Sequence, residues 1–323
     1  MQVIVRAAII LLTTLLMLAP ASAVEWPTRP VKIIVSQAAG GTPDIICRLI
    51  SDRLSKALGQ QFVVENRPGA ANVVGAIAAA RAAADGYTLF FAPAAALASN
   101  PHTFKSLSYD PLKDYVVVAM VAKTPFLVLV NSTVPIHSLA EMVAYDKANP
   151  GKLSIATDGP RFFSGMLATW LNKVSGAHVL QVPYATMPKG IQDTLAGRTQ
   201  IAILAIPAAA PYITSGMLKP IAISWPTRLP LYPDVPTLAE SYPGVEVTGW
   251  FAIVAPTGTP VDIVARLNQE TDKILKAPEV AKRLADLAFF TEGAETPDTA
   301  RTFVNAQYEL WGKVVREIGL EPE

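Results

Sequence analysis

Short apolar runs of strand length alternate along the chain with amphipathic stretches that repeat apolar positions at helical spacing. The first five segments of this kind are expected as strand 31–36, helix 43–58, strand 61–65, helix 73–84 and strand 88–92. Thr42 can cap the first helix, Pro43 suits its first turn, and Gly59 ends it. This β-α-β-α-β opening predicts an α/β fold with parallel strand pairing and right-handed crossovers.

A second series of the same kind occupies the rest of the chain. Its expected strands are 116–122, 126–130, 153–156, 179–182, 200–204, 221–224 and 251–255, and its expected helices are 139–148, 162–174, 189–196, 211–215, 260–276, 278–287 and 297–319. Five of the 27 prolines fall in residues 226–243, which indicates a long surface loop. We expect two lobes joined by crossing strands, with residues 24–125 plus 247–323 in lobe 1 and residues 126–246 in lobe 2. Open α/β sheets bind ligands where their strands end, so the cleft between the lobes is the expected site.

The N-terminus has the features of a secretory signal peptide. Arg6 provides a positive charge, residues 7–19 are almost all apolar, and Ala21-Ser22-Ala23 is a small-residue cleavage site. An apolar run of this length is too short to span a membrane comfortably. We expect a signal peptide over residues 1–23, cleavage after Ala23 and a periplasmic protein. An uncleaved membrane anchor is the alternative.

Composition and charge narrow the class of partner. The 27 Lys and Arg residues nearly balance the 26 Asp and Glu residues, so no electrostatic attraction to nucleic acid is expected. The single cysteine, Cys47, cannot form an internal disulfide and lies on an apolar helical face, which favours a core position. His102, His137 and His178 are far apart and share no metal-ligand spacing. We expect a monomer without metal or cofactor whose ligand is a small molecule.

Common catalytic motifs are missing from the sequence. No Gly-x-Ser-x-Gly, P-loop or dinucleotide-binding Gly-x-Gly-x-x-Gly motif follows a strand. Catalytic groups that are assembled from distant residues would escape such a search. An exported esterase or lyase therefore stays an alternative to a binding protein.

The loop over residues 37–44 follows the first strand and leads into the first helix. Its glycines let the backbone turn sharply and expose N–H groups, and the helix N-terminus adds its positive dipole end and unpaired amides. Such a loop can hold a carboxylate or a phosphate without a cationic side chain. The candidate ligand-binding residues here are Gln37, Ala38, Ala39, Gly40, Thr42 and Asp44. The alternative is a plain strand-to-helix connection in which Asp44 complements the helix N-terminus.

A second turn of this kind begins at Thr157, between a strand and a helix of the other lobe. Its amides could face the first loop, with Thr157 and Asp158 among the ligand contacts. Arg161 could grip a carboxylate bidentately, or could pair instead with a nearby carboxylate of the protein. Phe162 and Phe163 have a spacing typical of core residues and could alternatively form a wall of the pocket.

The order and spacing of a set of short motifs resemble those of a known family, the solute-binding receptors of tripartite tricarboxylate transporters, or Bug-type periplasmic receptors. These motifs are Trp26-Pro27-Thr28-Arg29-Pro30-Val31-Lys32, Ala38-Ala39-Gly40-Gly41 with Asp44, Val64-Glu65-Asn66-Arg67-Pro68-Gly69-Ala70, Asp85-Gly86-Tyr87-Thr88-Leu89, Asn100-Pro101, Tyr109-Asp110-Pro111 with Lys113-Asp114, Pro150-Gly151-Lys152-Leu153, Val182-Pro183-Tyr184, Asp234-Val235-Pro236-Thr237 and Ala255-Pro256-Thr257-Gly258-Thr259-Pro260. The resemblance covers nearly the whole mature chain.

The resemblance implies a two-lobe periplasmic-binding-protein (Venus-flytrap) fold without catalysis. In that family, backbone amides of the loop that corresponds to residues 37–44, helped by ordered waters, hold one ligand carboxylate. Loops that correspond to residues 92–96, 157–163 and 204–205 contact the rest of the ligand, and closure of the lobes buries it. The further contact residues implied in this way are Ala95, Ala96, Tyr184, Leu204 and Ala205.

Departures from the family's pattern bear on the choice of ligand. Ser36 and Gln37 stand where relatives usually have a proline and an aromatic residue, and Leu204 stands where they frequently have a pocket aspartate. That aspartate would suit an amino group, so its replacement argues against amino-acid ligands. A distal pocket that is apolar apart from Arg161 suits a carboxylate with a hydrophobic or aromatic body, or a medium-length dicarboxylate that ends on Arg161.

We therefore expect a receptor that captures a small organic carboxylate for the integral-membrane permease subunits of a tripartite transporter. The alternative output is signalling, in which the same capture feeds a sensor kinase of a two-component system. Both outputs need a ligand that favours the closed form over the open form.

Overall fold

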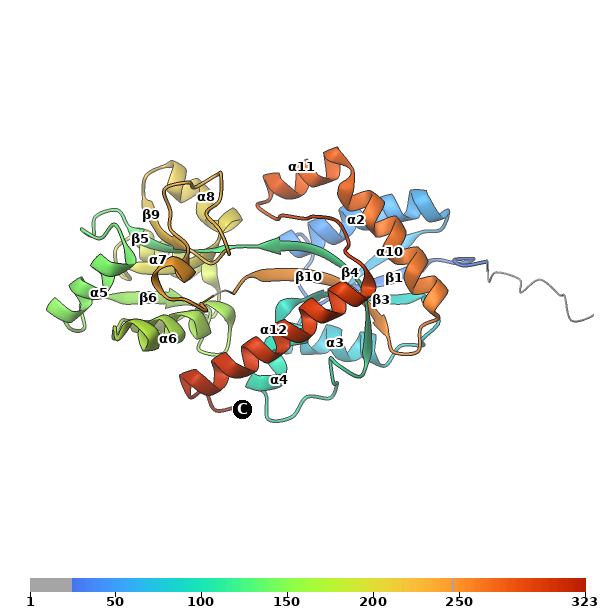
Figure 1. Cartoon of the computed structure of the whole chain (residues 1–323), viewed down its shortest axis with the longest axis horizontal. Coiled ribbons are helices and arrows are strands. Elements are labelled where there is room, and N and C mark those ends of the chain that lie inside the picture. Colours follow the sequence, from blue (N-terminus) through green and yellow to red (C-terminus); the bar gives the residue numbers. More distant parts are fainter. Residues whose placement is uncertain (1–24, 246) are drawn as a thin grey trace, which may run out of the picture.

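Two mixed β-sheets lie side by side in this protein, and helices cover each of them (Figure 1). The structure is a computed structural model that describes residues 25–245 and 247–323. The predicted signal peptide over residues 1–23 lies outside the described residues. The strands are β1 (Val31–Val35), β2 (Phe62–Asn66), β3 (Thr88–Pro93), β4 (Tyr115–Thr124), β5 (Phe126–Asn131), β6 (Ser154–Thr157), β7 (Leu180–Pro183), β8 (Ile201–Ala205), β9 (Leu218–Ile223) and β10 (Gly249–Pro256). The helices are α2 (Thr42–Leu58), α3 (Val73–Ala80), α4 (Asn100–Thr103), α5 (Leu139–Ala148), α6 (Phe163–Ser175), α7 (Met187–Leu195), α8 (Ile206–Thr214), α9 (Leu238–Ser241), α10 (Val261–Lys276), α11 (Pro278–Asp286) and α12 (Pro297–Ile318), with short turns η1 (Ala70–Asn72) and η2 (Ala95–Ser99).

The first sheet has the strand order β2-β1-β3-β10-β4. β1 pairs in parallel with both β2 and β3, which confirms the pairing predicted from the β-α-β-α-β opening. β10 lies antiparallel between β3 and β4, although the whole second sheet separates it from them in sequence. Because β1, β2 and β3 are parallel, the loops that follow them leave the same end of the sheet.

The second sheet has the strand order β7-β6-β8-β5-β9. β6 pairs in parallel with β7 and β8, and β5 is antiparallel to β8 and β9. Thr157, Pro183 and Ala205 end the three parallel strands, so the turns after them also gather at one end of this sheet.

Three connections join the two sheets. Pro125 alone separates β4 from β5, so one extended path runs from the first sheet into the second (Figure 1). Residues 224–248 lead back from β9 to β10. α12 is the third connection, because it contacts β4 and α4 on one side and α6 on the other. We propose lobe boundaries on this basis, with residues 24–125 plus 247–323 in lobe 1 and residues 126–246 in lobe 2.

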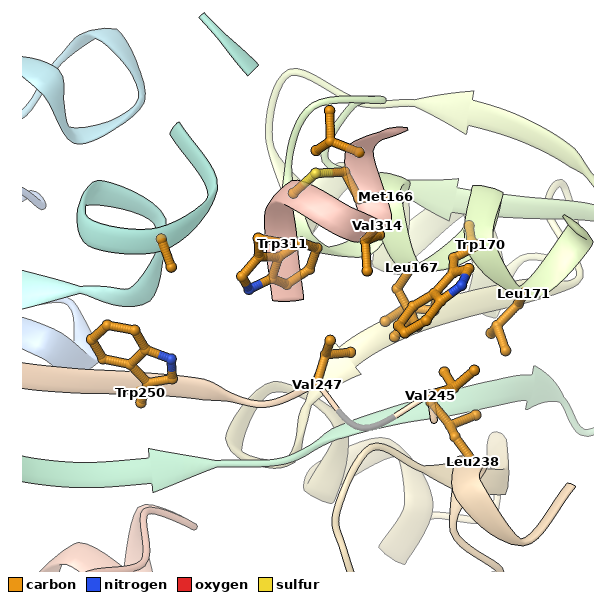
Figure 2. Close-up of a cluster of buried hydrophobic side chains, with 14 of the residues drawn as sticks. Met166, Leu167, Trp170, Leu171, Leu238, Val245, Val247, Trp250, Trp311 and Val314 are labelled. Atoms are coloured by element: carbon orange, nitrogen blue, oxygen red, sulfur yellow. The ribbon is translucent and has the colours of Figure 1, made fainter. Parts of the chain in front are cut away.

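A buried cluster with three tryptophans continues from one lobe into the other (Figure 2). Trp250 of β10 and Trp311 of α12 are each 1% exposed, and Trp170 of α6 is 4% exposed. Phe163 stacks on Phe126 at 4.0 Å between ring centroids and meets Trp311 edge-on at 5.6 Å. Aromatic pairs of this kind contribute about 1 kcal/mol each beyond the burial of their surface. α12 is therefore part of the core and holds the lobes together.

The observed helices differ from the predicted ones in three places. The helix predicted over residues 211–215 is α8, which begins already at Ile206. Gly41, with an extended backbone, is the N-cap of α2, and Thr42 is already helical. The expected side-chain cap by Thr42 is therefore wrong. The predicted loop 226–243 contains α9, whose N-cap Thr237 and third residue Glu240 exchange the two hydrogen bonds of a capping box.

Candidate ligand-binding site

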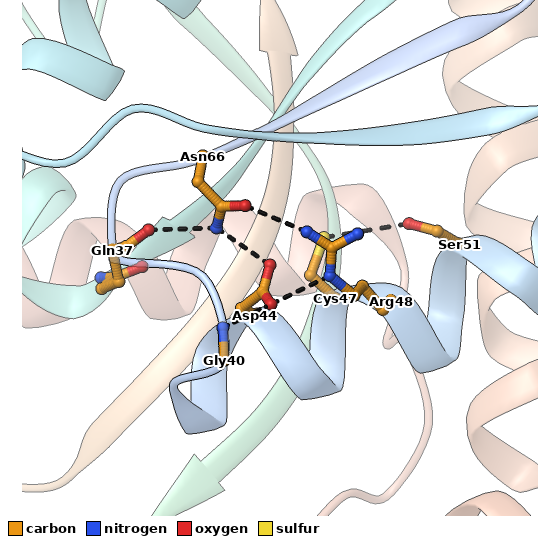
Figure 3. Close-up of polar contacts among 7 residues, drawn as sticks. All are labelled: Gln37, Gly40, Asp44, Cys47, Arg48, Ser51 and Asn66. Carbon is orange, nitrogen blue, oxygen red and sulfur yellow. Dashed lines mark hydrogen bonds and ion pairs between the residues drawn. The ribbon is translucent and has the colours of Figure 1, made fainter.

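The carboxylate of Asp44 ties the loop between β1 and α2 together (Figure 3). Asp44 is 2% exposed, and its Oδ2 accepts hydrogen bonds from the Gly40 N–H and from Nε of Arg48, each at 2.9 Å. Its Oδ1 accepts a hydrogen bond from Nδ2 of Asn66 at 2.9 Å. Asn66 also donates to the Gln37 carbonyl at 3.1 Å and accepts from the Arg48 guanidinium at 3.0 Å. The loop is thus fixed to both β2 and α2.

Burial and hydrogen bonding act in opposite directions on Asp44. Burial by itself would raise the pKa of the carboxyl group. The hydrogen bonds from Arg48, Gly40 and Asn66 outweigh burial, and together they lower that pKa. Asp44 is therefore ionised at neutral pH and acts as a structural anion that positions the loop.

Several N–H groups of the loop donate to no acceptor within residues 25–245 and 247–323. They belong to Ala38, Ala39, Thr42 and Asp44. The last two lie in the first turn of α2, where a helix offers no acceptor for its own amides. The Gly40 N–H differs, because it already donates to Asp44 and is not free for a ligand in this conformation.

Ser36 and Gln37 anchor the start of the loop to α3. The Ser36 hydroxyl donates to Oδ1 of Asn72 at 3.0 Å, and Nε2 of Gln37 donates to the same oxygen at 2.9 Å. Gly75 lies so close to Ser36 that an added Cβ would be 2.8 Å from the serine Cβ. Ser36 and Gly75 therefore pack directly against each other. Oε1 of Gln37 is buried without a hydrogen-bond partner among the described residues.

The turn after β6 is closed on itself. The Asp158 N–H donates to the Ser164 hydroxyl at 2.9 Å, and that hydroxyl donates to Oδ1 of Asp158 at 2.5 Å. Burial raises the pKa of the Asp158 carboxyl, while Ser164 and nearby backbone N–H groups of α6 oppose this effect. Thr157 is fully buried, and its carbonyl accepts the Tyr184 N–H at 2.9 Å. The amides at the start of α6 therefore already face a carboxylate of the protein.

Arg161 is bound by the last residues of the chain. Its guanidinium lies 3.1 Å from the Glu323 carboxylate and donates to the Glu321 carbonyl at 2.8 Å. Arg161 therefore pairs with a carboxylate of the protein in this structure, which is the second of its two predicted roles. Its prediction as a ligand-binding cation requires that this pairing be exchanged for the ligand.

The two phenylalanines after Arg161 point to different surroundings. Phe163 lies in the aromatic stack with Phe126 and Trp311, as expected for a core residue. Phe162 is 43% exposed and provides an apolar surface at the start of α6. Of the pair, Phe162 is the one that a ligand could contact.

The remaining predicted contacts are mostly engaged within their lobes. The Tyr184 hydroxyl donates to Asp193 at 3.0 Å, and Leu204 is buried at 3% exposure in the core of lobe 2. Ala205 is partly exposed at the end of β8. Ala95 and Ala96, predicted to lie in a loop, are in the π-helical turn η2; Ala95 is partly exposed and Ala96 is buried.

The loop over residues 36–44 and the turn over residues 157–163 each follow a parallel strand, one in each sheet, and the structure does not join them. No hydrogen bond or ion pair links residues 36–44 to residues 157–163 in the described part of the chain. The sequence reasoning missed Arg48 and Asn66 as positioning residues. Spacing offered a signal only for Arg48, because it follows Asp44 by four residues on one helix.

Cys47 and the histidines contribute no second site here. Cys47 is 1% exposed, and burial raises the pKa of its thiol to about 12, which confirms the predicted core position. Among residues 25–245 and 247–323, no group of three His, Cys, Asp or Glu side chains could hold a metal ion. No helix in these two ranges is both long and apolar enough to cross a membrane.

Comparison with known proteins identifies the class of fold. The adipate-bound Rpa4515 protein of R. palustris superposes with a TM-score of 0.81 at 31% identity, covering 92% of this chain and 100% of that protein. MatC of Rhodopseudomonas palustris with bound malate superposes with a TM-score of 0.76 at 31% identity, covering 90% and 100% respectively. Two mixed sheets covered by helices, arranged as two lobes, are the architecture of periplasmic binding proteins of this type.

Sequence comparison then gives the family. Residues 46–320 match the model of the tripartite tricarboxylate transporter family receptor. Protein BugT of Bordetella pertussis is 35% identical over 307 residues, which cover 93% of each chain. The chain belongs to the tripartite tricarboxylate transporter receptor family. Receptors of this family are periplasmic solute-binding proteins and are not enzymes.

Proposed function

We propose that this protein captures a small organic carboxylate in the periplasm and delivers it to the membrane permease subunits of a tripartite transporter. One observation carries the proposal. The unpaired N–H groups of Ala38, Ala39, Thr42 and Asp44 lie on a loop that Asp44, Arg48 and Asn66 hold in place. A rigid set of amides binds an anion without first losing conformational freedom.

The same loop accounts for anion binding without a cationic side chain. The N-terminus of α2 has a positive partial charge, and its first amides need an external acceptor. A carboxylate is preferred to a phosphate here because related receptors are known with adipate and with malate bound. Asp44 is already neutralised by Arg48, so a second carboxylate can approach its neighbouring amides.

Lobe 2 determines which carboxylate is bound. Its candidate surface is Phe162, Ala205 and the turn at Asp158, which is mainly apolar. We infer a carboxylate with a hydrophobic body or a medium-length dicarboxylate, of which adipate is the first to test. A dicarboxylate gains a second ion pair only if its far carboxylate displaces Glu323 from Arg161. Ligand that contacts both lobes favours the closed form over the open form.

The amide mechanism can be tested by deleting a single N–H. Thr42→Pro removes this donor while keeping the helix, because proline suits the first turn and Gly41 already has the extended backbone that a following proline requires. Thr42→Ala keeps the N–H and serves as the matched control. We expect Thr42→Pro to weaken carboxylate binding by about tenfold and Thr42→Ala by less than about threefold, because a hydrogen bond to a charged group contributes about 1.5–3 kcal/mol.

The ligand for this experiment comes from a thermal-shift screen. Adipate, hexanoate, citrate and 1,6-diaminohexane form a matched set that varies charge and length. A ligand that binds only the folded form raises its melting temperature by mass action. Stabilisation by adipate or hexanoate but not by the diamine is expected. Wild-type affinity in Thr42→Pro, or stabilisation by the diamine alone, would contradict the proposal.

A further inference from the structure

A cavity lies beside the crossing strands, away from the loops described above. Its volume is about 410 Å³, which is within the range of small-molecule pockets. It adjoins β4, the edge strand of the first sheet, whereas residues 36–44 and η2 follow β1 and β3. None of its lining residues belongs to residues 36–44 or 157–163. The cavity is therefore separate from the proposed carboxylate site.

Both lobes contribute to the walls of this cavity. Lobe 1 provides Lys123 of β4, residues 290–293, Glu295 and part of α12, and lobe 2 provides Trp225 and its two following residues. The Trp225 and Phe290 rings lie 5.6 Å apart between centroids, at an interplanar angle of 53°. An occupant would thus touch residues of both proposed lobes.

The lining combines aromatic rings with an excess of carboxylates. Its charged residues are Lys123, Glu292 and Glu295, which sum to one negative charge. The Lys123 ammonium lies 4.3 Å from the centre of the Phe303 ring and 3.4 Å from the Glu295 carboxylate, so a cation already uses this lining. Glu292 is exposed and forms no ion pair within the described ranges.

The backbone around the cavity supports a specific role for Glu295. Its φ of +57° is in the left-handed region, which non-glycine residues seldom adopt outside sites where the surrounding structure holds them. The Glu295 carbonyl is fixed by Nδ2 of Asn268 at 2.8 Å. The strained conformation keeps the Glu295 carboxylate in the cavity wall beside Lys123.

We propose that this cavity is a second ligand site, that it takes a small organic ammonium ion with a flat apolar body, and that its occupancy shifts the equilibrium between open and closed lobes. Trp225 and Phe290 provide faces for the apolar body and for cation–π attraction. Glu292 and Glu295 provide the counter-charge, which disfavours a carboxylate ligand. Because both lobes form the walls, we expect the occupant to bind the open and closed forms with different affinity, and that difference would couple it to the carboxylate site.

The site can be probed with three molecules of nearly equal shape: phenethylammonium, 2-phenylethanol and phenylacetate. We expect phenethylammonium to bind in calorimetric titrations about tenfold more tightly than the alcohol. Trp225→Ala should weaken its binding about tenfold, whereas Trp225→Phe, which keeps a ring, should change it less than about threefold. Any phenylacetate that binds the carboxylate site should be unaffected by Trp225→Ala, so failure of one site is distinguishable from failure of the other.

A gain of affinity provides a test that misfolding cannot imitate. Lys123→Met removes the internal ammonium, which frees both Glu295 and the face of Phe303, and should strengthen phenethylammonium binding several-fold. Saturation with phenethylammonium should also change the affinity for the carboxylate found in the thermal-shift screen. Equal binding of the three probes, no binding of phenethylammonium, or weaker binding in Lys123→Met would overturn the site. Unchanged carboxylate affinity would overturn the coupling.

Discussion

The loops after β1 and after β6 are built alike but differ in what their aspartates do. In lobe 1, Asp44 accepts hydrogen bonds from Arg48 and Asn66, and the amides around it stay open. In lobe 2, Asp158 has no arginine or lysine ion pair among the described residues, and it faces the first amides of α6 itself. A carboxylate that pairs with an arginine leaves the helix N-terminus available, whereas one that faces the first amides occupies the position of a ligand. We therefore propose lobe 1 as the anion-binding side of the molecule.

Alanine substitutions of Gly165, in the first turns of α6, and of Gly40, in the loop before α2, should differ most in their effect on the free energy of unfolding. In Gly165→Ala the new Cβ would lie 2.0 Å from the Gly159 carbonyl oxygen, so the turn must move. We expect a loss of about 3 kcal/mol in the free energy of unfolding. In Gly40→Ala the new Cβ would have no atom within 4 Å, so the only cost is the φ of +80°, which L-residues rarely adopt. We expect the free energy of unfolding to fall by about 1–2 kcal/mol. Urea denaturation measures both, and equal losses would remove the contrast.

Neutralising the two aspartates should have unequal effects. Asp44→Asn loses charge-assisted hydrogen bonds to Arg48 and Gly40, and should lower the free energy of unfolding by about 2 kcal/mol and weaken carboxylate binding. Asp158→Asn removes a buried charge and keeps the acceptor for Ser164, so it should change stability by less than about 1 kcal/mol. Chemical denaturation at neutral pH, with calorimetry for the ligand, compares them. A larger loss in Asp158→Asn would reverse our assignment of roles.

The pH dependence of these two variants should have opposite signs. The folded-state pKa of Asp44 is lowered, so its stabilising contribution is complete above the unfolded pKa of about 3.9 and is lost as pH falls through the folded value. The folded-state pKa of Asp158 is raised, so its contribution is present below about pH 3.9 and is lost as pH rises through the folded value. The stability difference between wild type and each Asn variant, measured across acidic pH, should move in these opposite directions.

Removing the arginine of lobe 2 should have the smallest effect. The Arg161 and Glu323 side chains are 26% and 68% exposed, so their ion pair contributes less than about 1 kcal/mol. We expect Arg161→Ala to change carboxylate affinity less than about threefold and to speed hydrogen exchange at the Lys105 N–H, which donates to the Glu323 carbonyl at 2.8 Å. Glu323→Gln is the matched control. A tenfold loss of affinity only in Arg161→Ala would show that Arg161 turns to the ligand on closure.

Local signals in the sequence predicted most elements of the fold. Gly59 ends α2 in the left-handed conformation as expected, and α5 has the predicted bounds Leu139–Ala148. The short helix α9 was missed because the prolines around it suggested a loop, although Thr237 and Glu240 have the spacing of a capping box. Local sequence patterns therefore predict helices and strands well where glycines and prolines fall at the ends of the periodic segments.

The candidate site was predicted less completely because its geometry depends on distant residues. The loop sequence indicates open amides, but it cannot indicate that Asn66 of β2 would hold Asp44 from the next strand. Nor does any local pattern place Arg161 beside Glu323, far along the chain. Glycines and helix starts therefore predicted the backbone features of the site. The partners of its side chains come from distant parts of the chain, and only the tertiary fold shows them.

The position of β10 has a consequence for the order in which this chain folds. β10 fills the space between β3 and β4, so neither strand can complete its pairing until residues 249–256 have been made. The five strands of the second sheet, by contrast, are contiguous in the chain. We therefore expect the second lobe to fold first, although chains commonly fold from the N-terminus onward. Until then β4 has an unpaired edge, and a chaperone that binds extended segments would find its target there.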